Sequence, residues 1–367
     1  MNDMSLPHGG FARVGDEPVS LAVRERAQSD DRTMLRAAAD LTRDLNTANP
    51  RIYWADFLGS ALLGYLGLGV ALLTGSTGTM MLAGLVGTLA LYRAGSFIHE
   101  LTHIKHSQLP GFRLAWNMLF GVPLLVPSFL YEGVHNMHHA KTRYGTAEDP
   151  EYLPLALMKP WSLPLFLLFA ALSPLLLIGR FAIAAPLSML SPRLRELVVA
   201  RYSGLQINPH FRRRAPEGEF RRQWLWQEAA CSIWALTLVT LAVTGVVPLR
   251  EFAIFLAIAS GVLFLNQVRT LVAHLWENDG EPMTVTAQYL DSVNVPPPAT
   301  LPALWAPVGL RYHALHHLLP GVPYHNLGEA HRRVSAVLNR GSVYHATSHR
   351  GLTPLLLRLA KSTLGRR

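Results

Sequence analysis

The sequence predicts an all-α integral membrane protein with four transmembrane helices arranged in two hairpins. The prediction rests on the composition, on four long apolar segments, and on one strongly basic stretch between them. Of 367 residues, 50% are hydrophobic and only 16% are charged. Soluble domains usually carry about 25% charged residues, so this composition favours the bilayer as solvent.

The two hairpins follow from pairs of apolar runs. The first pair is 57–74 and 80–98, joined by a Gly/Ser/Thr turn, and the second is 229–247 and 252–272. Each run approaches the roughly 20 residues that a helix needs to cross hydrocarbon. The segments 111–131 and 161–191 are also apolar but are interrupted by prolines, so we expect interfacial or partly buried helices there.

The basic stretch predicts the orientation in the membrane. Eight arginines lie between residues 193 and 222: Arg193, Arg195, Arg201, Arg212, Arg213, Arg214, Arg221 and Arg222. The positive-inside rule places this stretch on the cytosolic side. Since each hairpin leaves and returns to that side, both termini are expected to be cytosolic, in a bacterial cytoplasmic membrane. The net charge of +9 then belongs to a membrane-facing surface, and no nucleic-acid partner is expected.

The polarity of the chain divides it into three expected parts. Residues 1–50 form a polar lead-in without a signal peptide, residues 51–335 form the membrane domain, and residues 336–367 form a basic tail. The chain has one cysteine, Cys231. A cysteine-based metal site and an internal disulfide are therefore excluded.

Histidine is concentrated in short clusters. The chain contains His99 and His103 as HELTH, two HxxHH triplets, and His274 at the end of the fourth run. In a random chain with sixteen histidines, HxxHH is expected roughly 0.03 times, and here it occurs twice. Residues three and four apart share a helix face, so we expect each cluster to aim its imidazoles at one point. The triplets are His135, His138 and His139, and His313, His316 and His317.

The clusters lie at the cytosolic ends of the predicted spans and supply nine imidazoles. One zinc ion takes only four ligands, so nine imidazoles indicate two metals with four or five nitrogens each. Imidazole suits zinc, copper, iron and nickel alike. Apolar spans that can admit a lipid chain favour iron and dioxygen chemistry. Soluble carboxylate di-iron bundles are disfavoured because the chain lacks their ExxH pairs.

These motifs resemble the three histidine boxes of the membrane fatty-acid desaturases and their hydroxylase relatives. The resemblance covers about residues 50–335 and includes the text around the third box, HHLLP from His316 and PYHNL from Pro323. It implies four transmembrane helices under a cytosolic cap that holds two Fe²⁺ ions. The implied ligands are His99, His103, His135, His138, His139, His274, His313, His316 and His317.

Four further residues are candidates for supporting the ligands. His106 and His325 lie close to boxes by spacing. Asp149 closely follows the second box, where a carboxylate can hydrogen-bond a ligand imidazole, and a solvated turn at Asp149-Pro150 is the alternative. Asn266 is polar near the end of the fourth run, where hydrocarbon contact is costly. The histidines His8, His210, His331, His345 and His349 are expected to be ordinary surface or core residues.

The resemblance implies an oxygen-dependent desaturase that abstracts hydrogen from an unactivated fatty acyl chain of a lipid. The alternative is a lipid, alkane or carotenoid hydroxylase on the same scaffold, because the short first box resembles the alkane-hydroxylase branch. Expected partners are the lipid, dioxygen and a separate ferredoxin-like electron donor, since the chain has no haem, flavin or iron–sulfur motif.

Two rival classes are less well supported by the sequence. A metal or proton transporter places ionisable residues in the middle of its spans, and the predicted span cores contain none. A bis-histidine haem carrier needs opposed pairs of ligands within a bundle rather than triplets.

Overall fold

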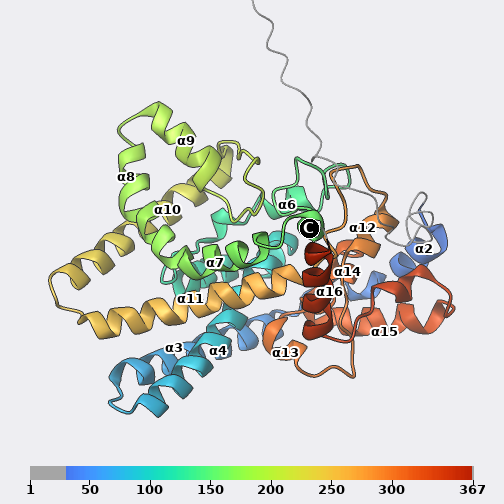
Figure 1. Cartoon of the computed structure of the whole chain (residues 1–367), viewed down its shortest axis with the longest axis horizontal. Helices are drawn as coiled ribbons and strands as arrows, with labels where there is room; N and C mark the ends of the chain where they lie inside the picture. The colour runs from blue at the N-terminus through green and yellow to red at the C-terminus, as the bar shows by residue number, and fades with distance from the viewer. Residues whose placement is uncertain (1–29, 366–367) are drawn as a thin grey trace, which may run out of the picture.

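A computed structural model describes residues 30–365. Across these residues the chain forms helices and four isolated β-bridges, and no strand. Long helices form a bundle, and short helices form a cap at one end of it (Figure 1). The prediction of an all-α fold is confirmed.

Among residues 30–365, five helices are long and apolar enough to cross a membrane, one more than the sequence predicts. Four of them cover most of the predicted runs: α3 (Pro50–Leu73), α4 (Thr77–His103), α10 (Gly218–Val243) and α11 (Leu249–Leu271). The fifth candidate covers 162–188 and begins with α7 (Ser162–Gly179). The chain is thus a multi-pass membrane protein.

The fifth candidate was unexpected because of its prolines and its arginine. Pro164 falls in the first turn of α7, where the missing N–H has no helical partner to lose. A π-helical segment (Arg180–Ala184) follows and leads into α8 (Ala185–Ser188). The buried guanidinium of Arg180 is paired with the carboxylate of Glu228 on α10 at 2.6 Å. This ion pair offsets the cost of burying the arginine.

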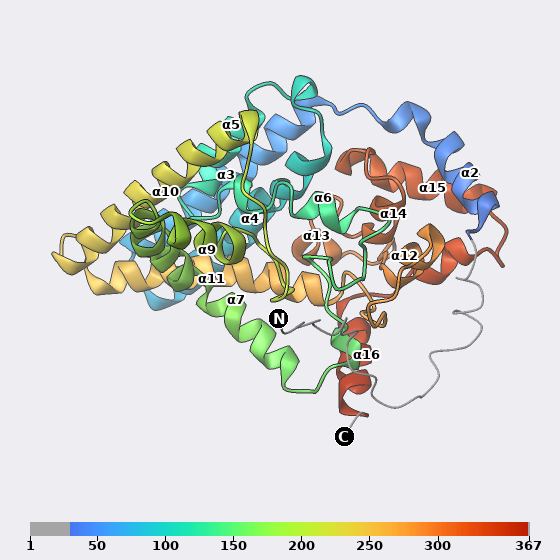
Figure 2. The same cartoon turned by 90° about the horizontal axis from the view of Figure 1, so that it is seen from above.

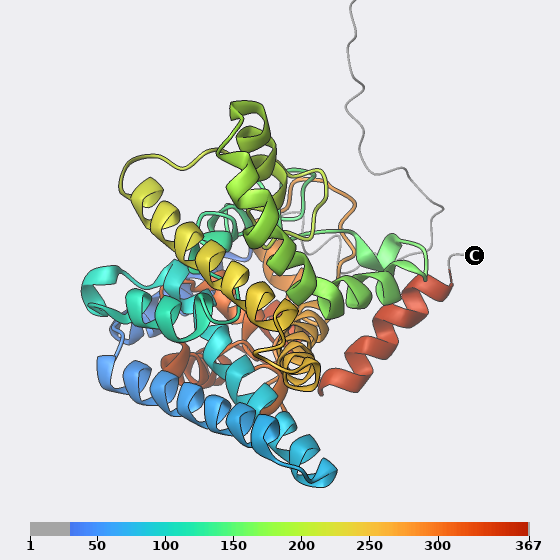
Figure 3. The same ribbon diagram turned by 90° about the vertical axis from the view of Figure 1, so that its left-hand side faces the viewer.

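Helix α9 (Pro192–Tyr202) is too short to cross the membrane. After α9 the chain returns to the segment that follows the first HxxHH triplet. There the side-chain amide of Asn208 donates to the backbone oxygens of Ala147 and Asp149, at 3.0 and 2.9 Å. Figure 3 views the bundle from the hairpin turns, with α3 and α4 in blue, α10 and α11 in yellow and orange, and α7 to α9 in green.

The first hairpin packs closely because of glycines on the two facing helices. A Cβ atom on Gly67 of α3 would lie 2.7 Å from the backbone nitrogen of Gly87 on α4. Small residues allow helix backbones to approach in membranes, where van der Waals packing drives association. An aromatic cluster that includes Tyr53, Phe57, Phe97 and Phe112 continues this core toward the cap.

The cap is assembled from short helices that come from both ends of the chain and from the segment after the first hairpin. They are α2 (Arg32–Leu41), α5 (Phe112–Trp116), α6 (His135–His138), α12 (Val285–Asp291), α13 (Pro302–Trp305), α14 (His313–Leu318), α15 (Leu327–Val337) and α16 (Leu352–Leu364). Helix α2 lies beside α15 at the outer edge of the cap (Figure 2), where Met34 and Ala38 share a core with Ala330 and Val334. The segment 111–131, expected to be interfacial or partly buried, forms only short helices.

Candidate metal centre

The nine clustered histidines lie where the bundle meets the cap. His99 and His103 stand one turn apart at the end of α4, and His274 follows the end of α11 by three residues. The triplets are carried by α6 and α14. The helix ends therefore deliver all nine rings to one region, as the sequence predicts.

The nine rings form two groups rather than one set for each motif. Within each group, one nitrogen from every ring lies within 4.8 Å of the others. The first group is His99, His103, His135, His139 and His316, and the second is His138, His274, His313 and His317.

The expectation that each HxxHH triplet aims at one point is wrong, because both triplets are shared between the groups. In both triplets the first and last histidines, four residues apart, share a group, and the middle histidine, about 100° around the helix from the last, does not. His138 and His139 therefore point to different groups. His316 likewise separates from His313 and His317.

Within each group the ring nitrogens converge through Nε2. The Nε2 atoms of His135 and His139 lie 3.0 Å apart, as do those of His274 and His313. The Nε2 of His316 lies 3.1 Å from that of His103. Nitrogen ligands about 2.1 Å from a shared cation and at right angles to each other would be separated by about 3.0 Å. The spacing therefore fits a metal centre.

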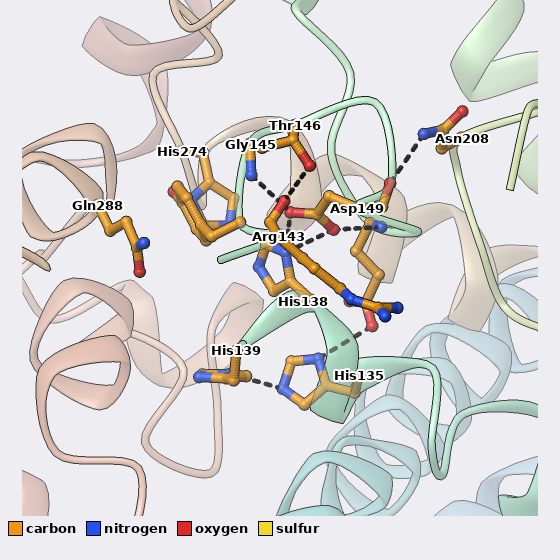
Figure 4. A network of polar contacts seen from close by, with 12 residues as sticks. His135, His138, His139, Arg143, Gly145, Thr146, Asp149, Asn208, His274 and Gln288 are labelled. Atoms are coloured by element: carbon orange, nitrogen blue, oxygen red, sulfur yellow. Dashed lines mark hydrogen bonds and ion pairs between the residues drawn. The ribbon is translucent and has the colours of Figure 1, made fainter. Parts of the chain in front are cut away.

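The tautomers of the rings support the same conclusion. Nδ1 of His138 contacts the Asp149 carboxylate at 2.9 Å (Figure 4). Nδ1 of His135 contacts the Glu151 carboxylate at 3.0 Å. A carboxylate accepts, so Nδ1 carries the proton and Nε2 presents a lone pair. Lone pairs that face each other at 3 Å repel unless a cation lies between them.

His274 is held through an intermediate hydroxyl instead of a carboxylate. Its Nδ1 lies 2.7 Å from the hydroxyl of Tyr144, which in turn donates to Asp291 at 2.9 Å. Because the hydroxyl donates its proton to Asp291, it accepts from Nδ1 of His274. The Nε2 lone pair of His274 is thereby also turned toward its group.

Burial keeps most of these rings neutral. It is the chief reason that the pKa values of His139, His274, His313 and His317 are lowered well below 6.5. Neutral imidazole is the form that binds metal. At His138 burial also lowers the pKa, but the charge and hydrogen bond of Asp149 outweigh it, so the pKa is raised.

Several buried ring nitrogens have no hydrogen-bond partner among residues 30–365. They include both nitrogens of His99 and the Nδ1 atoms of His313 and His316. An unsatisfied buried polar atom is costly and requires an explanation. A bound cation would provide the missing partner for the nitrogens that face it.

The supporting residues expected from the sequence lie at different distances from the centre. Asp149 is in contact with His138, as described. His106 is exposed on a pocket wall, and the imidazole of His325 bonds to Asn326 and to the backbone of Asn49. Within the described residues, neither these two nor the side chain of Asn266 hydrogen-bonds to any of the nine histidines.

Other supporting residues escaped the sequence analysis. Glu151 lies two residues beyond Asp149 and belongs to the same acidic run, so the run itself was the available signal. Tyr144 and Asp291 are 147 residues apart, and no spacing links them to His274. Only the folded chain brings these two together.

Comparison with known proteins agrees with this geometry. The family model described as fatty acid desaturase matches residues 77–348. The chain belongs to the fatty acid desaturase family. The resemblance inferred from the histidine boxes is thus confirmed, and the chain is an oxidoreductase of this family, with a metal centre suggested by its histidines.

A curated relative corrects the expected reaction. It is the protein named ceramide hydroxylase from Caulobacter vibrioides (strain NA1000 / CB15N), which is 52% identical over 324 residues, or 88% of this chain and 92% of the relative. The main prediction, desaturation, is therefore wrong, and hydroxylation agrees better. Histidine boxes are shared by both reaction types because both begin by attacking an unactivated C–H bond, so the boxes alone do not separate them.

Proposed function

We propose that this protein hydroxylates the ceramide class of lipids. The observation that carries the proposal is the 52% identity to the ceramide hydroxylase, which extends over most of both chains. Of the lipid, alkane and carotenoid hydroxylases considered from the sequence, this identity favours the lipid. The five apolar helices agree with a substrate that is drawn from the bilayer.

We propose that the nine histidines hold two iron ions, one in the group of five and one in the group of four. Imidazole nitrogens in this number, with no cysteine nearby, suit iron as well as other first-row metals. When bound, the irons supply the reduction of dioxygen and the oxidising power that inserts one oxygen atom into a C–H bond. The balanced reaction consumes the lipid, dioxygen, two electrons and two protons, and yields hydroxylated lipid and water.

The protein's own residues prepare the site for this chemistry. Asp149 and Glu151 fix the rings of His138 and His135 in the tautomer that presents Nε2, and Tyr144 does so for His274. The surrounding burial excludes water and keeps the rings neutral. Such partners raise ligand basicity and hold ring orientation.

The two electrons come from a separate donor, for which a ferredoxin-like protein is proposed. The exposed arginines Arg212 and Arg214, near the histidine side of the bundle, suit an acidic partner. Arg213, from the same basic run, is not available for docking. It is buried, donates to the backbone oxygen of Glu132 at 2.6 Å and lies over the ring of Trp224.

We also propose that α3, α4, α10 and α11 cross a bacterial cytoplasmic membrane, with the histidines on the cytosolic side. Asn208 hydrogen-bonds the backbone oxygen of Asp149, so the chain is back on the histidine side by residue 208. The only helix between 188 and 208 is α9, which has eleven residues and is too short to cross the membrane. This path supports the proposal that 162–188 does not cross the membrane either. Four crossings keep the long loops on the arginine-rich side.

Lipid mass spectrometry of a ceramide-producing host that expresses the chain tests the proposal. Ceramide should gain the mass of one oxygen atom, and His138→Ala should abolish this product while the protein remains in the membrane. His210→Ala is the matched control, because His210 is exposed and belongs to neither group. Loss of two hydrogens from the lipid, or full activity of His138→Ala, would refute the proposal.

A further inference from the structure

Helix α16 (Leu352–Leu364) lies outside the part of the chain that matches the family model, which ends at residue 348. The sequence alone predicts only a basic tail here. The structure instead places an amphipathic helix against the side of the molecule. Its function is therefore not explained by the family's shared features.

One face of α16 packs against the rest of the protein. Leu355, Leu359 and Thr363 are buried on it, at spacings of four residues. The Ser362 hydroxyl donates to the backbone oxygen of Ala156 at 2.9 Å, and Arg358 pairs with Glu277 at 2.7 Å. The helix is thus a docked element with a fixed orientation.

The position of α16 coincides with the ends of two candidate spans. Leu355 and Leu359 line a pocket together with Leu271, the last residue of α11, and with His274. Helix α16 also packs on residues 155–157, just before α7 begins at Ser162. In Figures 1 and 2, α16 runs across the direction of α11, at the end of α11 that meets the cap.

An exposed tryptophan near α16 indicates how deep the helix lies relative to the membrane surface. Trp161, directly before α7, is 60% exposed. Tryptophan is enriched at the membrane–water boundary because its ring is amphipathic. Helix α16 packs on residues 155–157, four residues before Trp161 in the chain, and runs across the direction of α11, as a helix in the plane of the interface would.

The free face of α16 has the chemistry of an interfacial helix. Leu357 and Leu364 are 54% and 49% exposed and stand two turns apart on one stripe. Arg358 and Lys361 are exposed beside that stripe. From residue 350 to residue 367 the sequence contains five basic residues and no acidic one, although Arg366 and Arg367 lie outside the described residues. Apolar stripes flanked by lysine and arginine seat helices on anionic bilayers.

We propose that α16 is an in-plane membrane-surface helix that inserts Leu357 and Leu364 among lipid chains and binds anionic lipid headgroups through Lys361. Leu355 and Leu359 line the pocket that reaches His274. Binding of α16 to the bilayer therefore holds this side of the candidate metal centre at the membrane surface. The proposal concerns membrane contact and does not depend on the reaction catalysed.

Site-specific fluorescence in nanodiscs tests the proposal on the full chain. Bimane is attached to Leu357→Cys and, as a control, to Arg340→Cys, which is exposed on the cap. The native Cys231 is buried, and the unsubstituted protein measures its background labelling. The nanodiscs contain equal parts of phosphatidylcholine and phosphatidylglycerol. Quenchers are iodide in water and a nitroxide on the lipid chain.

The lipid-borne quencher should act on position 357 and not on position 340, and iodide quenching at position 357 should be several-fold weaker than at position 340. Equal iodide quenching at both positions, without lipid-borne quenching at position 357, would overturn membrane insertion and leave the leucine stripe open to a protein partner. Lys361→Glu, or phosphatidylcholine alone, should weaken the lipid-borne quenching. If neither change has an effect, the anionic-headgroup part of the proposal is wrong.

Discussion

The carboxylate of Asp149 is fully buried and is occupied on both oxygens. It accepts from the backbone N–H groups of Gly145 and Glu151 at 2.8 Å, and it contacts the His138 ring. The backbone thus fixes the carboxylate, and the carboxylate fixes the imidazole. A buried charge held in this way keeps the ring in place before a metal arrives.

Replacing Asp149 by Ala should weaken metal binding by about 10- to 100-fold, the effect usual for a lost partner of a ligating histidine. Metal analysis after dialysis against graded chelator concentrations measures the change. Glu148→Gln is the control, because the neighbouring Glu148 side chain is 74% exposed. Equal metal retention in both variants would argue against a supporting role for Asp149.

Acid should destabilise the metal-free protein. Burial lowers the pKa values of His135, His139, His274, His313, His316 and His317 from 6.5, so these rings stay neutral in the folded state while the unfolded chain takes up protons. Stability is therefore full above about pH 6.5 and falls as the pH drops below that value. Groups with raised pKa values oppose this trend but are outnumbered by the six rings. Among them are His138 and the carboxyls of Glu151 and Asp291, whose pKa values burial raises to about 7 and about 6.

Thermal unfolding of the metal-free protein between pH 8 and pH 5 measures this dependence, in a range chosen to bracket the histidine pKa of about 6.5. The Tm should fall across the acidic half of the range. A Tm that is constant or rises on acidification would contradict the assigned protonation states.

Among the elements, the α3–α4 hairpin depends on close approach of two backbones. Gly67→Ala should destabilise it by about 1–3 kcal/mol, the usual cost of overpacking, because the new methyl group meets the α4 backbone. Gly69→Ala on the same helix is a matched control, since a Cβ atom there meets nothing within 4 Å. Thermal unfolding in detergent compares the two variants, and equal Tm values would show that the hairpin tolerates separation.

The sequence predicted these hairpins because hydrocarbon demands long apolar runs, and such runs are visible without a structure. At 161–191 it predicted an interfacial or partly buried helix and not a candidate span, because proline and arginine usually interrupt a span. The compensating partner of Arg180 is Glu228 on another helix, and no local pattern reveals that pairing. Likewise, histidine spacing identified the nine rings but not their division, because the middle histidine of each triplet joins the other group and only the folded chain shows which rings it meets there.

On the scale of the whole molecule, the basic surface should govern reduction by the electron donor. Arg212→Ser combined with Arg214→Ser should slow reduction of the bound metal and leave metal content unchanged, because exposed charges mainly accelerate encounter. Stopped-flow reduction by a purified ferredoxin measures the rate. The rate in the unsubstituted protein should fall with rising salt, since the Debye length is only about 10 Å at 0.1 M.

Arg332→Ser is the control for this experiment, because Arg332 is exposed on α15 and paired with Glu329. A slower rate in the control alone would move the docking surface to α15. Arg213 should not be changed with its neighbours, since its loss would leave buried backbone oxygens without a donor.

The proposed division into 1–50, 51–335 and 336–367 stays a prediction, although α2 shares a core with α15.

Because each HxxHH triplet contributes rings to both groups, the two proposed iron positions share the same two short helices. We infer that loading one position offsets the repulsion among the lone pairs that face it, and so stabilises the positions of α6 and α14 that the other group also requires. Iron uptake by the empty protein should therefore be cooperative, with a Hill coefficient above one and little protein carrying a single ion. Partial iron supply in a cell would then yield a mixture of fully loaded and empty molecules, rather than a population of half-loaded enzyme.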